Sequence, residues 1–303
     1  MQKIFILLLI LVLTLFAKEK TENSGNIIRK NIKHFFAHSV SLCTSFLYND
    51  DVNNCNYISN NSKFKIYFDT TTDENKNTKT SLSLRAKIGL PKIDNNLFLT
   101  LDKESTQSQE NREHSDIRDL TSDNNTRVGL KYYFKRSDDT KIYTKLGAKI
   151  RLSSSSDIYF KAGATNLKKF NNFDLYSYIN EYYYIKADIF KTQIGSNIIN
   201  KLNDKYTIYL NNEIRLETHQ NETLHNSLIL NQYLNKDSML SYWTTLNSSY
   251  DSSLISDNIS LNLKYHHMIN DWIFYEISPS LVKQLKDKKD IHKYLHINFG
   301  FIF

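Results

Sequence analysis

The sequence predicts an all-β protein: a transmembrane, antiparallel, up-and-down β-barrel of about fourteen strands, preceded by a short amphipathic helix. Three observations predict this fold. From residue 63 onward, apolar and polar residues alternate in segments of about ten residues, as expected for strands with one face in lipid. Short polar links join the segments. Beyond Phe16, no apolar run approaches the roughly 20 residues of a membrane-spanning helix, which leaves a closed barrel as the membrane structure that satisfies the backbone.

Residues 1–17 have the pattern of an export signal: Lys3, an uncharged apolar run over residues 4–16, and then Ala17. We expect cleavage after Ala17. A membrane anchor is the alternative, but the run is shorter than the roughly 20 residues that cross a bilayer. No cysteine follows the run directly, so a lipoprotein anchor is not expected.

Residues 18–61 differ in pattern from the rest of the chain. Apolar residues recur at helical spacing between Ile28 and Leu47, which predicts an amphipathic helix over residues 26–47 and a polar loop after it. This segment would lie in the periplasm or plug the barrel, which we expect to occupy residues 62–303. Cys43 and Cys55 are expected to pair in an oxidising compartment, and two reduced thiols are the alternative.

The alternation is clearest over residues 81–90, where Leu82, Leu84 and Ile88 alternate with Ser83, Arg85 and Lys87. Similar segments recur to the end of the chain. Fourteen strands are expected near residues 63–69, 79–91, 95–104, 124–135, 140–152, 156–167, 172–186, 189–200, 205–217, 223–234, 238–250, 256–268, 272–283 and 292–303. Because residues 172–200 and 223–250 alternate poorly, twelve or sixteen strands remain alternatives.

The links between these segments predict which end of the barrel faces the periplasm, because bacterial barrels have short periplasmic turns and longer outer loops. With both termini inside, the short links fall at residues 91–95, 136–139, 166–171, 201–204, 235–237 and 269–271. The longer ones fall at residues 70–78, 105–123, 218–222, 251–255 and 284–291. Two links of the outer set, near Ser153 and Asp188, are short, so the parity is imperfect.

Aromatic residues gather near the ends of the expected strands, as in the girdles of membrane barrels. Those expected near the periplasmic rim are Tyr132, Phe134, Phe173, Tyr206, Trp272 and Phe303, and those near the outer rim are Tyr182, Tyr183, Tyr184, Tyr250 and Tyr294. A soluble two-sheet sandwich also alternates and is the chief structural alternative. A last strand that ends on Phe303 favours the barrel, because it looks like the signal that the barrel assembly machinery reads.

Two stretches resemble a group of uncharacterised bacterial outer-membrane β-barrel proteins. They are residues 83–91 with the following 97–102, and residues 265–279, above all 271–279, which read Asp-Trp-Ile-Phe-Tyr-Glu-Ile-Ser-Pro. The resemblance implies the barrel fold and an outer-membrane location, and it implies no activity. Such proteins often carry a second acidic residue after the last proline, and here Ser280 stands instead.

Several classes of function are not expected. The formal net charge of +7 is spread along the chain rather than clustered, so nucleic acid is not an expected partner. The seven glycines never cluster, which excludes phosphate loops and dinucleotide fingerprints. His34 and His38 have a metal-ligand spacing but no third ligand nearby, so no metal or other cofactor is expected. No serine is marked as a nucleophile beside a histidine, so catalysis is not expected, although a lipid hydrolase remains a third alternative.

The polar face of the alternating strands carries the candidate lumen residues. They are Arg85, Lys87, Arg127, Lys131, Lys145, Lys149, Arg151, Lys161, Lys191, Arg215 and Lys264, with the acidic Asp102, Asp174, Glu213 and Glu276. This excess of cations favours a passive pore for small polar or anionic solutes. A closed barrel with a structural or assembly role is the alternative. Outer-membrane lipids and the assembly machinery are the expected partners, and the sequence does not fix the oligomeric state.

Overall fold

The computed structural model describes residues 63–90, 93–103, 126–150, 156–250, 253–285 and 291–302. These residues belong to one compact unit, Asn61–Ile302. Several expectations fall outside the described residues: the export signal, the helix over residues 26–47, the Cys43–Cys55 disulfide, Arg151 and Phe303. Among the described residues, no helix has the length and apolar character needed to cross a membrane.

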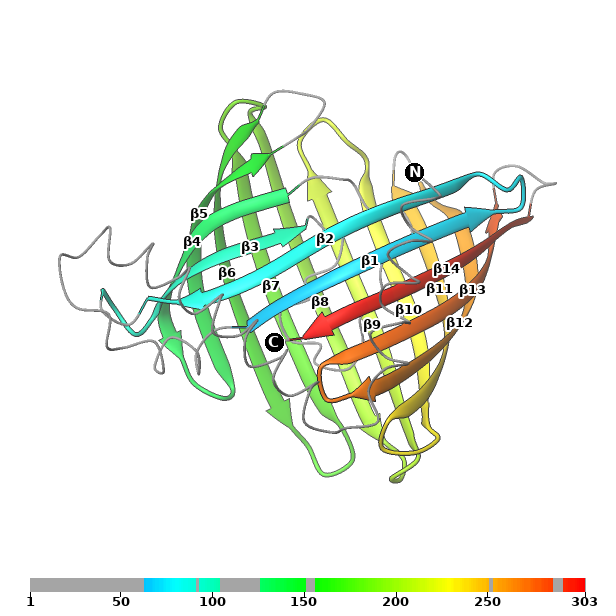
Figure 1. Ribbon diagram of the computed structural model, residues 1–303. Coiled ribbons are helices and arrows are strands. Elements are labelled where there is room, and N and C mark those ends of the chain that lie inside the picture. Colours follow the sequence, from blue (N-terminus) through cyan, green and yellow to red (C-terminus); the bar gives the residue numbers. More distant parts are fainter. Residues whose placement is uncertain are drawn as a thin grey trace. The chain divides into compact units, whose positions relative to one another are not determined.

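The described chain forms a closed antiparallel barrel of fourteen strands, which confirms the fold and strand number expected from the alternation (Figure 1). The strands are β1 (Lys63–Asp73), β2 (Thr78–Gly89), β3 (Leu97–Lys103), β4 (Thr126–Arg136), β5 (Thr140–Ile150), β6 (Asp157–Lys169), β7 (Asp174–Tyr184), β8 (Ile189–Lys201), β9 (Tyr206–Glu217), β10 (Glu222–Tyr233), β11 (Ser238–Tyr250), β12 (Leu254–Asn270), β13 (Ile273–Gln284) and β14 (Ile291–Ile302). Each strand pairs with its neighbours in sequence.

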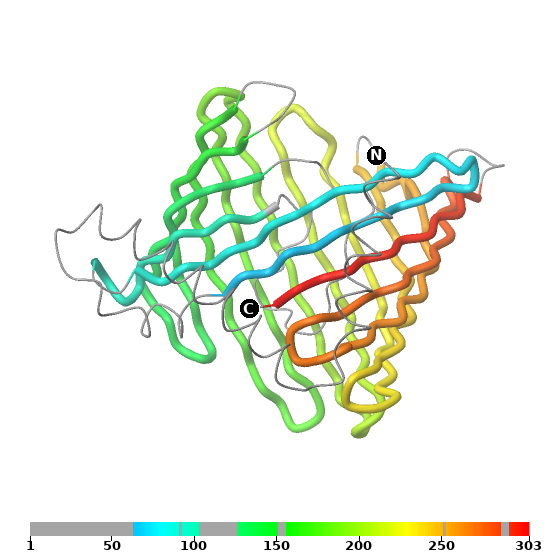
Figure 2. The backbone as a smooth tube through the Cα atoms, in the orientation of Figure 1, coloured from blue at the N-terminus to red at the C-terminus, as the bar shows by residue number. Residues whose placement is uncertain are grey.

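The first and last strands close the barrel. β1 pairs with β14 in a register that runs from Lys65 opposite Ile302 to Asp73 opposite Tyr294, and the two strands lie side by side in blue and red in Figure 1. Figure 2 follows the successive hairpins round the wall between them. Because the sheet closes on itself, the strands that would be its edges satisfy each other's backbone groups.

Four of the five links that were expected to be long are shorter than the sequence predicts. β1 continues through Thr70, Thr71 and Thr72 to Asp73, so the link expected at residues 70–78 shrinks to residues 74–77. The threonines carry no apolar alternation. β1 persists because they pair with polar residues of β2 on one side and with Ile297, His296 and Leu295 of β14 on the other. Residues 104–125, between β3 and β4, are by far the longest link.

The two faces of the wall differ in chemistry. Apolar side chains such as Leu82, Leu146 and Leu261 are exposed on the outer face, Leu82 by 65%. Charged and polar side chains on the alternate positions of the same strands are buried. This is the reverse of a soluble protein, and it matches a barrel whose outside contacts lipid and whose inside is polar.

Candidate functional site

The candidate site is the polar interior face of the barrel. Eight of the charged residues expected there are buried: Arg127, Lys131, Lys145, Lys149, Glu213, Arg215, Lys264 and Glu276. Four more of the expected cations are partly exposed: Arg85, Lys87, Lys161 and Lys191. They belong to the same inner face, because their partners in the strand register also face inward. Asp102 lies among them opposite Arg127, and Asp174 is the first residue of β7.

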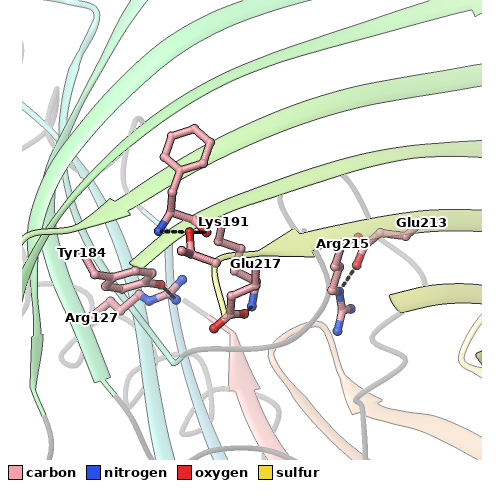
Figure 3. Close-up of polar contacts among 8 residues, drawn as sticks. Arg127, Tyr184, Lys191, Glu213, Arg215 and Glu217 are labelled. Atoms are coloured by element: carbon pink, nitrogen blue, oxygen red, sulfur yellow. Dashed lines mark hydrogen bonds and ion pairs between the residues drawn. The ribbon is translucent and has the colours of Figure 1, made fainter. Parts of the chain in front are cut away.

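Arg127 of β4 sits among three tyrosines. Its guanidinium carbon lies 5.3, 5.2 and 5.7 Å from the ring centroids of Tyr159, Tyr182 and Tyr184, and its Nη2 donates a hydrogen bond to the Tyr184 hydroxyl (Figure 3). A guanidinium at this distance is attracted by the negative face of an aromatic ring. The rings therefore stabilise the buried guanidinium without neutralising its positive charge.

Lysines of β4, β5 and β6 are held in a similar way. Lys131 Nζ lies 3.4 Å from the centroid of the Tyr143 ring, and Lys161 Nζ lies 5.2 Å from the same centroid. Between them, Lys145 Nζ lies 5.6 Å from the Tyr159 centroid and forms a 2.7 Å ion pair with Asp102. We call this part of the interior, from β4 to β7, the cation–tyrosine wall; it consists of Arg127, Lys131, Tyr143, Lys145, Lys149, Tyr159, Lys161, Tyr182 and Tyr184.

A second group of interior charges, on β8 and β9, is paired with carboxylates. Glu213 accepts hydrogen bonds from the Arg215 guanidinium and from the hydroxyl of Tyr178 on β7. Further along the same strands, Lys191 Nζ lies 3.2 Å from a Glu217 carboxylate oxygen. Figure 3 draws both pairs in one view with the Arg127 and Tyr184 contact. Each positive charge here has an acidic partner within ion-pair distance.

A third group joins β12, β13 and β14. Glu276 lies 3.3 Å from Lys264 Nζ and 3.1 Å from His266 Nδ1, and it accepts a 2.8 Å hydrogen bond from the Asn298 side-chain amide. Around it the inner face is rich in amides and hydroxyls, including the buried Asn231, Ser241, Asn262 and Ser280. The β8–β14 side of the interior therefore combines ion pairs with neutral polar groups.

Glycines on the inner face make room for aromatic rings of the neighbouring strand. A Cβ built on Gly147 would lie 2.9 Å from the Tyr159 ring, and one on Gly163 would lie 2.6 Å from the Tyr143 ring. Gly195 and Tyr178 make the same pair at 2.3 Å. In each case the glycine and the ring stand directly opposite in the register, as do Gly300 and Phe274. The Tyr143 and Tyr159 rings lie over their glycines, and their faces are also in contact with Lys131 and Arg127.

Two aromatic residues expected in the outer girdle lie elsewhere. Tyr182 and Tyr184 are buried on the inner face, whereas Tyr183 between them is 39% exposed on the outer face. The expectation for Tyr182 and Tyr184 was wrong because it considered their distance from the strand end and ignored the alternation of β7. The sequence reasoning also missed Glu217, although it shares the parity of Glu213 and Arg215 and could have been found by that rule.

A serine–histidine contact bears on the hydrolase alternative. Ser238 Oγ lies 2.8 Å from His267 Nδ1, and the His267 ring lies against Tyr265 and Tyr275. A hydrolytic triad needs a third group that orients the histidine, and none is seen at His267 within the described part of the chain. The described residues also contain no group of three or more His, Cys, Asp or Glu that could hold a metal ion.

Comparison with known proteins identifies related folds. The sequence matches no protein-family model and no curated protein. The barrel is similar to OmpT, an outer membrane protein of Vibrio cholerae, in a form lacking loop L8: 10% identity, TM-score 0.52, covering 80% of this chain and 98% of that one. It is also similar to the outer membrane channel DcaP of Acinetobacter baumannii, with 9% identity, TM-score 0.51, and coverage of 80% and 96%. At these identities the similarity establishes the barrel fold.

Proposed function

We propose that the protein is an integral barrel of the bacterial outer membrane that acts as a passive pore for small polar solutes and prefers anions. The observation that carries this proposal is the reversed chemistry of the wall: apolar outside, charged and polar inside, in a closed barrel of fourteen strands. The similarity to solved outer-membrane barrels supports the location, because those proteins have the same fold.

The preference for anions follows from the charges of the cation–tyrosine wall. Low-dielectric walls focus the potential of buried charges into the lumen, and anion-preferring pores are lined by Lys and Arg. The cation–tyrosine wall carries five cations, of which Lys145 pairs with Asp102. On β8–β12, by contrast, Lys191, Arg215 and Lys264 each lie within ion-pair distance of a carboxylate. A solute in the lumen would therefore meet one positive side and one nearly neutral side.

One observation favours a second candidate, a closed barrel with a structural or assembly role. The short side chains Asn231 and Ser241 on the inner face are only 1% and 2% exposed. In a wide, open lumen, short residues of the wall would contact water. A filled interior would bury them, whether other side chains or another part of the chain fills it.

Single-channel conductance of the purified protein in a planar bilayer separates the two candidates. A pore gives discrete current steps. In a potassium chloride gradient we expect a reversal potential closer to the equilibrium potential of chloride than to that of potassium. Replacing Lys145, Lys149 and Arg151 together with Gln should reduce that potential, because the cation–tyrosine wall loses two positive charges and a third is lost at Arg151, which the alternation predicts to face the lumen. The matched control is Lys201→Gln, which removes a lysine from the exposed end of β8, where it pairs with Asp204.

Three results would contradict the proposal at different points. Selectivity for potassium in the natural protein would overturn the role of the inner cations. An absence of conductance in correctly folded protein would overturn the pore and favour the closed barrel. Recovery of the chain as a soluble periplasmic protein, rather than as a heat-modifiable band in outer-membrane fractions, would overturn the location.

A further inference from the structure

Three lysines of the cation–tyrosine wall stand directly opposite one another on adjacent strands. Lys131 of β4 pairs with Lys145 of β5, and Lys145 pairs with Lys161 of β6. We call these three residues the lysine row. Neighbouring strands lie about 4.8 Å apart, so the row places three positive charges over a backbone span of roughly 10 Å. Like charges directly opposite in a sheet destabilise it, so the row opposes stability at these positions.

Ring faces and one carboxylate limit this cost. The Tyr143 ring lies against the ammonium groups of both Lys131 and Lys161, and Asp102 pairs with Lys145. Cation–π contacts attract the ammonium groups without cancelling their charge. Because one aspartate contributes a single negative charge to three lysines, the row with Asp102 has a formal charge of +3 − 1 = +2.

The members of the row differ in accessibility. Lys131 is 1% exposed, so it acts on a solute through its field, which is weakly screened because the group is buried. Lys161 has intermediate exposure and can contact a solute. Along the same lateral line, Lys161 is followed by Tyr182 on β7 and by Lys191 on β8, which extends the line toward the ion-paired side of the interior.

We propose that the lysine row is a binding site for multivalent anions, specifically compounds with several carboxylate groups, with Lys161 as the contact residue. The proposal rests on the proposed pore function and names its preferred solutes. The preference among anions depends on their charge. If the potential at the lysine row is worth about RT per unit charge, it enriches a monovalent anion about threefold and a trivalent anion about twentyfold. The amides and hydroxyls on the opposite side suit the uncharged polar groups of such solutes.

The test compares block of the chloride current by citrate, a tricarboxylate, and by acetate, a monocarboxylate. In the natural protein we expect citrate to half-block the current at a concentration about tenfold below that of acetate. Lys161→Gln should raise the citrate value about tenfold, because both contact and charge are lost, and Lys131→Gln about threefold, because only the field is lost. Acetate should change by less than about twofold in both variants.

Two further variants separate charge from structure. Lys161→Arg keeps the charge and should retain block by citrate. Lys236→Gln removes a lysine from the exposed link between β10 and β11 and should behave as the natural protein. Each variant is first shown to fold by its heat-modifiable mobility.

A second measurement, calorimetric titration of citrate into the folded protein in detergent, keeps the two proposals apart. Conductance with equal block by citrate and acetate, or citrate block unchanged by Lys161→Gln, would overturn the site and leave the pore. No conductance, but citrate binding that Lys161→Gln abolishes, would overturn the pore and support the site. Absence of both conductance and binding would overturn both.

Discussion

Replacing Gly195 with alanine should destabilise the barrel substantially, because the new methyl group would occupy space that the Tyr178 ring fills. The added Cβ would lie 2.3 Å from the ring carbon that bears the hydroxyl and 2.4 Å from the hydroxyl oxygen. Carbon atoms pack at about 3.5 to 4.0 Å, so the ring must move by more than about 1 Å. That movement would break the hydrogen bond from the Tyr178 hydroxyl to Glu213, which also holds Arg215.

The expected loss of unfolding free energy combines two coupled costs. Overpacking costs about 1 to 3 kcal/mol, and loss of a hydrogen bond to a charged group costs about 1.5 to 3 kcal/mol. Because relief of one cost produces the other, we expect a total of about 3 kcal/mol rather than the full sum. Urea titration of the protein folded into lipid vesicles, followed by the electrophoretic shift of the folded band, measures this difference.

The control is Ser196→Ala, one position further along β8 and on the opposite face, which should change stability by less than about 0.5 kcal/mol. A double-mutant cycle with Tyr178→Ala isolates the pair: once the ring is absent, Gly195→Ala should cost less than about 1 kcal/mol. The reasoning is refuted if Gly195→Ala is as stable as the natural protein, or if its cost is the same with and without the ring.

Three further predictions concern other parts of the chain. Glu276→Leu removes the carboxylate 3.3 Å from the buried Lys264 ammonium and should lower the unfolding free energy by about 3 to 5 kcal/mol, measured by the same urea titration; stability equal to the natural protein would show that the pair is dispensable. Phe303→Asp should block assembly, seen as loss of the heat-modifiable band, whereas normal insertion would show that the terminal signal lies elsewhere. Cys43 and Cys55 should resist alkylation until reductant is added, and two thiols that react at once would contradict the disulfide.

Alternation in the sequence predicts the barrel well, because the period of two is a direct consequence of strand geometry and of the different solvents on the two faces. It performs less well where both faces carry similar residues. In β10, Ile229 is inward-facing and 1% exposed, which weakens the alternation in the region that left the strand number open. At the end of β1, the threonines give no signal although they continue the strand.

The contacts of the interior are harder to predict, because they depend on register. Parity alone places Arg127 and Tyr184 on the inner face, but nothing in their spacing along the chain brings β4 next to the rim of β7. The same holds for Lys145 and Asp102, which belong to strands separated by β4 and a long link. The candidate residues are therefore visible in the sequence, whereas their partners require the closed sheet.

The glycine–aromatic pairs also constrain how the sequence can change over evolutionary time. At Gly195 and Tyr178, where the ring supplies the nearest contacts, a larger residue at the glycine is acceptable only after the ring has been exchanged for a smaller side chain, whereas the ring can shrink first without a clash. Substitutions at such a pair therefore have a permitted order, and the glycine is the later step. An engineer who wishes to enlarge the interior should follow the same order and begin with the ring.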